Sequence, residues 1–155
     1  MEQREVSEDG VLTRIGQAVM LLHGGDREEA RNRFGELWTE IGESGDPLHR
    51  CTLAHYMADT QDDPGDELAW DLRALTAAED PGPATARTAS AVRAFYPSLH
   101  LNLAADYLKL QRPDAARLHL SRARAADVLG GHRCLARQIG GVEAHQRRTA
   151  PVQLG

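Results

Sequence analysis

The sequence lacks the features that mark a β-sheet protein or one held together by disulfides. Aromatic residues make up only 5% of its 155 residues, and no stretch alternates apolar and polar side chains over several Val, Ile or Thr residues. The two cysteines, Cys51 and Cys134, stand far apart and match no disulfide or zinc spacing. These absences argue against a β-fold, and we expect both thiols to be reduced, as in a cytoplasmic protein.

Signals for export, membrane insertion and common types of catalysis are also missing. The first ten residues are polar and acidic rather than basic and apolar, and no apolar run approaches the roughly 20 residues that span a bilayer. No glycine-rich phosphate loop, GxSxG elbow or HExxH motif occurs. We therefore expect a cytoplasmic protein that neither enters a membrane nor carries a cofactor.

What the sequence does contain is leucine and alanine. Apolar residues account for 41% of the chain, and with so few aromatics the core must rest on Leu and Ala, which favour closely packed helices. Only one of the 18 basic residues is a lysine, Lys109, a bias typical of high-GC bacterial genomes such as those of actinobacteria. Length and composition together predict one all-α domain.

Charge is distributed unevenly along the chain. Residues 26–80 carry 15 acidic and 5 basic side chains, whereas residues 81–155 carry 4 acidic and 11 basic ones. Where sequence order becomes spatial order, as in stacked helical repeats, the molecule is then polarised in space. Complementary halves of this kind would suit a homodimer, which is one of the partners we consider.

Periodic apolar positions and helix-ending residues predict seven helices. Asp26 and the pair Asp46-Pro47 have the residue types preferred at helix starts, and Gly24-Gly25 those preferred at helix ends. The expected helices cover about residues 11–23, 27–41, 47–60, 64–78, 84–110, 114–129 and 132–147, and residues 1–10 and 148–155 are expected to be flexible. Pro97 predicts either a bend within the fifth helix or a new start there.

One spacing of small and large apolar residues occurs three times in the chain. Its copies are Ala18, Leu21, Ala30, Phe34 and Leu37; Leu53-Ala54, Met57, Leu68, Leu72 and Leu75; and Leu103-Ala104, Tyr107, Ala116, Leu120 and Ala123. The pattern resembles the tetratricopeptide repeat (TPR), a unit of two antiparallel helices. The resemblance implies a right-handed superhelix over residues 11–147, with repeats at about 11–45, 46–80 and 84–130 and a capping helix at 132–147. A plain helical bundle is the alternative architecture.

The resemblance also implies a function, which is to bind a protein or peptide partner without catalysis. In such repeats the first helix of each pair lines a concave groove. Carried over to this sequence, the partner-binding groove comprises Leu12, Ile15, Val19, Cys51, His55, Asp59, Leu101 and Lys109. The seventh helix or the N-terminal arm could instead occupy this groove.

A second hypothesis places chemistry on one helical face. Cys51, His55 and Asp59 are spaced four residues apart and therefore share a face, where they could form a metal site or the centre of a thiol enzyme. Three or four converging ligands are needed for zinc, and only His23 or His100 is available to join them. We therefore favour a polar stripe within the groove, with a hydrogen bond from His55 to Asp59 and pH sensitivity near 6.5.

The rear half of the chain has a basic region. It consists of Arg112, Arg117, Arg122, Arg124, Arg133 and Arg137. Nucleic acid is an unlikely partner for it, because aromatic stacking residues are scarce and the whole chain is acidic. We interpret the region as a solvated helical surface.

Overall fold

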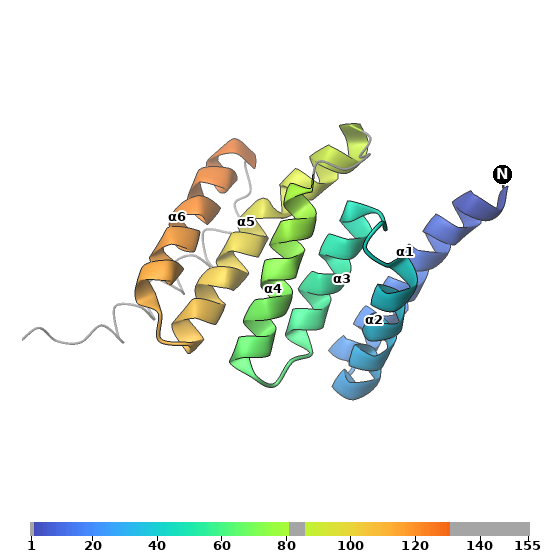
Figure 1. Cartoon of the computed structure of the whole chain (residues 1–155), viewed down its shortest axis with the longest axis horizontal. Helices are drawn as coiled ribbons and strands as arrows, with labels where there is room; N and C mark the ends of the chain where they lie inside the picture. Colours follow the sequence, from blue (N-terminus) through green and yellow to red (C-terminus); the bar gives the residue numbers. More distant parts are fainter. Residues whose placement is uncertain (1, 81–85, 131–155) are drawn as a thin grey trace, which may run out of the picture. The chain divides into compact units, whose positions relative to one another are not determined.

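The computed structural model describes the backbone of residues 2–80 and 86–130 and the side chains of residues 10–80 and 91–126. The described backbone is all-helical (Figure 1). Its helices are α1 (Glu2–His23), α2 (Arg27–Ile41), α3 (Pro47–Asp59), α4 (Pro64–Glu79), α5 (Ala86–Lys109) and α6 (Pro113–Gly130). None of these described helices is both long and apolar enough to cross a membrane. The expected capping helix at 132–147, the tail at 148–155, Cys134, Arg133 and Arg137 lie outside the described residues.

The chain divides into two compact units, residues 1–93 and residues 94–155, with the division inside α5. A single domain over residues 11–147 stays a prediction.

Three aspartates begin helices in the first unit. Asp26, Asp46 and Asp63 precede α2, α3 and α4, and the carboxylate of each accepts a backbone N–H of the first turn at 3.3, 2.8 and 3.1 Å. Each bond satisfies one of the donors that a helix leaves unpaired at its start. The starts predicted at Asp26 and Asp46-Pro47 are therefore confirmed.

Two helices differ from the expected boundaries. Helix α1 begins at Glu2, so the predicted start at Val11 was nine residues too late. Polar residues such as these form a helix once the apolar turns that follow have nucleated it, because propagation is far less costly than nucleation. Helix α5 continues through Pro97, so the helix does not start anew there.

The core of the first unit lies between α1, α2 and α3. Helix α2 packs against α1 and α3, α1 also contacts α3, and α3 packs against α4. Phe34 and Leu37 of α2 and Leu53 of α3 are at most 1% exposed in this core. Burying side chains of this size stabilises the fold by about 1.5–3 kcal/mol each.

A single arginine ties the start of α2 to the turn between α3 and α4. Arg27 Nη2 donates to the carbonyl oxygens of Thr60 and Gln61 at 3.4 and 2.9 Å, and it forms an ion pair with Asp62 at 2.6 Å. Its contacts therefore link the first helix pair to the second.

The second unit has a smaller described core. Leu101 and Ala104 of α5 lie in one buried cluster with Leu120 of α6. Ala116 and Ala123 of α6 are fully buried as well. Small residues at these positions allow the two helices to approach closely.

Two helix ends have the same hydrogen-bond pattern but different residues. After α1 the N–H of Asp26 donates to the carbonyl of Leu21, and after α5 the N–H of Arg112 donates to that of Tyr107. The residue before each donor is in the left-handed conformation, with φ of 93° at Gly25 and 58° at Gln111. Glycine adopts this conformation freely, whereas a side chain makes it unfavourable by about 1–2 kcal/mol.

We predict that Gln111→Gly stabilises the protein and that Gly25→Ala destabilises it, each by about 1 kcal/mol. Urea unfolding followed by circular dichroism measures both changes. Gln111→Ala is the matched control, because alanine keeps the side-chain penalty and should leave the free energy of unfolding nearly unchanged. An equal gain from Gln111→Ala would contradict the assigned backbone conformation.

Candidate binding groove on helices α3 and α4

The eight residues of the predicted concave groove do not form one accessible surface. Leu12, Asp59 and Lys109 are exposed and Val19 and His55 are half-buried, but Ile15, Cys51 and Leu101 are buried. Ile15 belongs to the core between α1 and α2, and Leu101 to the core between α5 and α6. Neighbouring side chains of the chain itself therefore cover these three residues, and they line no open surface in the structure.

The face predicted for chemistry has an unreactive thiol. Burial raises the pKa of Cys51 to about 12, so the thiol is protonated at neutral pH and is a poor nucleophile and metal ligand. Burial lowers the pKa of His55, against the opposing effect of Asp59, and the ring of His55 stacks edge-on against Tyr56 at 5.1 Å between centroids. The pH sensitivity expected near 6.5 therefore shifts to lower pH.

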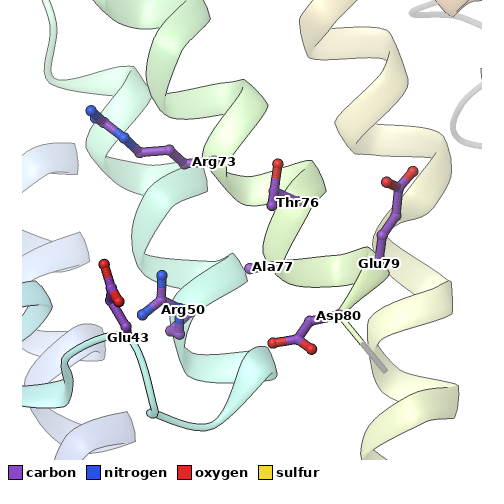
Figure 2. Close-up of a pocket in the computed structure, with 7 residues that line it drawn as sticks. All are labelled: Glu43, Arg50, Arg73, Thr76, Ala77, Glu79 and Asp80. Atoms are coloured by element: carbon purple, nitrogen blue, oxygen red, sulfur yellow. The ribbon is translucent and has the colours of Figure 1, made fainter. Parts of the chain in front are cut away.

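A groove crosses the first unit elsewhere, over α3 between the end of α2 and α4. One part is a pocket of about 450 Å³, and an adjoining pocket has about 380 Å³. The two share Glu43, Arg50 and Arg73, and together we call them the Arg–Trp groove. It is lined by Trp38, Thr39, Gly42, Glu43, Arg50, Arg73, Thr76, Ala77, Glu79 and Asp80. Figure 2 shows Arg50 beside Glu43, with Arg73, Thr76 and Glu79 in succession along α4.

Both tryptophans of the chain hold an arginine in this groove. The guanidinium carbon of Arg50 lies 4.8 Å from the ring centroid of Trp38, and that of Arg73 lies 4.3 Å from Trp70. The two indoles meet edge to face, with centroids 5.2 Å apart and planes at 83°. Stacking of this kind favours a cation by about 0.5–1 kcal/mol at a solvated site and orients the guanidinium.

The groove is lined by charged side chains of both signs. Arg50 Nη1 donates to the carbonyl of Gly42, which anchors the guanidinium at the loop between α2 and α3. Carboxylates of Glu43, Glu79 and Asp80 line the groove around the two arginines. An occupant therefore meets two positive charges and three negative ones within one concave surface.

The sequence contained part of this site. Trp70 and Arg73 are three residues apart on one helix, a spacing that places side chains on the same face. The pairing of Trp38 with Arg50 has no such signal in the sequence, because the loop between α2 and α3 separates them. Trp70 of α4 lies between helices, in edge-to-face contact with Trp38 of α2.

The second unit has a stack of four rings, in which two buried histidines lie between two half-buried tyrosines. Neighbouring centroids are 6.3 Å apart for Tyr96 and His100, 5.3 Å for His100 and His119, and 5.4 Å for His119 and Tyr107. Nδ1 of His100 and Nδ1 of His119 lie 3.0 Å apart. Such a contact is a hydrogen bond only while one nitrogen carries a proton and the other does not. Protonation of both rings would therefore break it.

The surroundings of this pair oppose a positive charge. Burial, then the neighbouring His100 and Arg122, lower the pKa of His119 to about 4. Burial and Arg122 also lower the pKa of His100. The unfolded chain therefore binds protons near pH 6.5 that the folded chain does not bind until the pH is lower.

We predict that stability is lost as the pH falls from about 6.5 to 4. Over that range the unfolded state binds more protons than the folded state, because the pKa of His119 is lowered to about 4 by burial and by the neighbouring His100 and Arg122. Urea unfolding at a series of pH values measures this, and His119→Asn should flatten the dependence. Replacement of His23 by Asn is the matched control, because His23 is exposed and lies outside the ring stack. An unchanged slope in His119→Asn would contradict the assignment.

Comparison with protein-family models, with curated proteins and with solved structures found no match for this chain.

Proposed function

We propose that this protein is a non-enzymatic interaction module of the TPR-like type, which holds a peptide segment in the Arg–Trp groove. The contacts of the first four helices support the repeat arrangement. Helix α1 packs against α2 and also against α3, the first helix of the next pair. Contact between the first helices of successive pairs is what stacking of helical repeats requires.

The observation that carries the proposal is the Arg–Trp groove itself. It is concave, belongs to one compact unit, and combines indole surface with oriented guanidinium groups. Tryptophan and arginine are the residues that most often dominate the energy of protein interfaces. Helices α2, α3 and α4 hold them on a packed scaffold, so little order needs to be gained on binding.

The alternative of a thiol or metal-dependent enzyme on the Cys51 face receives no comparable support. Cys51 is fully buried, whereas Asp59 of the same face is exposed. A thiol with a pKa of about 12 also lacks the thiolate character that nucleophilic cysteines have.

A selection from a random library of 12-residue peptides tests the proposal. Trp38 lines the groove and Trp70 stacks on its Arg73, so the intrinsic fluorescence of the two tryptophans reports occupation of the groove without a label. We expect selected peptides to change the fluorescence and to bind the double variant Arg50→Ala, Arg73→Ala at least tenfold more weakly, since a charged hydrogen bond contributes about 1.5–3 kcal/mol.

Arg117→Ala is the matched control, since Arg117 is an exposed arginine of the other unit. It should bind the peptides as the unchanged protein does. If the groove variant keeps its helical circular dichroism and still binds the peptides with full affinity, the binding site does not lie in the groove.

A further inference from the structure

We propose that the Arg–Trp groove recognises an acidic peptide segment, in which one Asp or Glu carboxylate is held between Arg50 and Arg73. This inference rests on the proposed peptide-binding function and adds the chemistry of the occupant. It depends on which arginines of the first unit are already neutralised and which are not.

The acidic part of the chain pairs three of its five arginines internally. Residues 26–80 carry 15 carboxylates and five arginines, so acids are in threefold excess. Arg27 and Arg31 reach Asp62 at 2.6 and 3.8 Å, and Arg33 reaches Glu29 at 3.1 Å. Because carboxylates outnumber arginines threefold here, the absence of an ion pair at an arginine must have a local structural cause.

The two remaining arginines are those of the groove. Among the residues that the structure describes, Arg50 and Arg73 form no ion pair, although Glu43 lines the same pocket. Instead, each guanidinium stacks on an indole. Two guanidinium groups that form no ion pair therefore line one pocket in the acidic part of the chain, although three carboxylates line it as well.

Stacking on an indole leaves N–H groups of both arginines available to donate to a carboxylate. A guanidinium that lies over an aromatic ring contacts it through its flat face, while its N–H groups point outward in the plane. Arg50 uses Nη1 for the carbonyl of Gly42, and Arg73 has no hydrogen bond within the described residues. The N–H groups left over are directed donors, and carboxylates accept such donors in pairs.

The charges around the arginines favour a single carboxylate over a polyanion. Glu43 offsets one of the two positive charges, and Glu79 and Asp80 repel a second anion further along the groove. A nucleic acid would also have to approach a segment with a net charge of −10. A peptide with one acidic side chain, followed by neutral or basic residues, meets both ends of the groove favourably.

The experiment uses the full chain and the peptides from the library selection, synthesised with acetylated and amidated ends. We expect each tight binder to contain an Asp or Glu whose replacement by Asn or Gln weakens binding at least tenfold. In the double variant Arg50→Gln, Arg73→Gln the acidic peptide and its amide counterpart should bind equally. Arg73→Lys, which keeps the charge but loses the planar fork, should give an intermediate loss.

Glu43→Gln supplies a readout that damage to the fold does not mimic. Removing this carboxylate should tighten binding of the acidic peptide several-fold and leave its amide counterpart unaffected. If selected peptides bind at the groove but tolerate replacement of their acids, the acidic occupant is wrong while the peptide-binding function stands. Displacement of the peptide by micromolar inorganic phosphate or by a single-stranded oligonucleotide would also overturn the inference.

Discussion

The edge-to-face contact of Trp38 with Trp70 is the interaction on which the candidate site depends. It joins α2 to α4, the two helices that flank the groove and that both pack against α3. Each indole then holds one arginine, and the loop carbonyl of Gly42 anchors the first of these. An aromatic pair of this kind adds about 0.5–1.5 kcal/mol beyond the burial of its surface. The same contact therefore provides both stability and the geometry of the guanidinium groups.

The two units use polar groups in different ways. In the first unit, ion pairs such as Arg27 with Asp62 lie at the surface, where they are solvated and contribute little each. The second unit buries a polar pair, His100 and His119, in its ring stack. A buried hydrogen bond between two imidazoles depends on a single shared proton. Protonation of both rings would break this contact, so the second unit contains an acid-sensitive interaction within its packed interior.

Local physical rules made most of the helices predictable. Aspartate at helix starts, glycine after helix ends and proline in the first turn act within four residues, so their effect can be found without knowledge of the fold. The starts at Asp26 and Asp46 are examples. The early start of α1 was missed because a polar segment has no apolar periodicity, although it can extend a helix that is already formed.

The sequence by itself determined that this protein is helical, because apolar periodicity and helix-capping residues depend on near neighbours along the chain. It also placed Trp70 and Arg73 on one face, since they are three residues apart. Only the tertiary structure decided which side of each helix is covered, and it buried Ile15, Cys51 and Leu101, which had been assigned to an open groove. It also brought together Trp38 with Arg50, and His100 with His119, across loops. Contacts of this kind depend on how helices pack, and packing is set by the combined shapes of several helices rather than by any spacing within one.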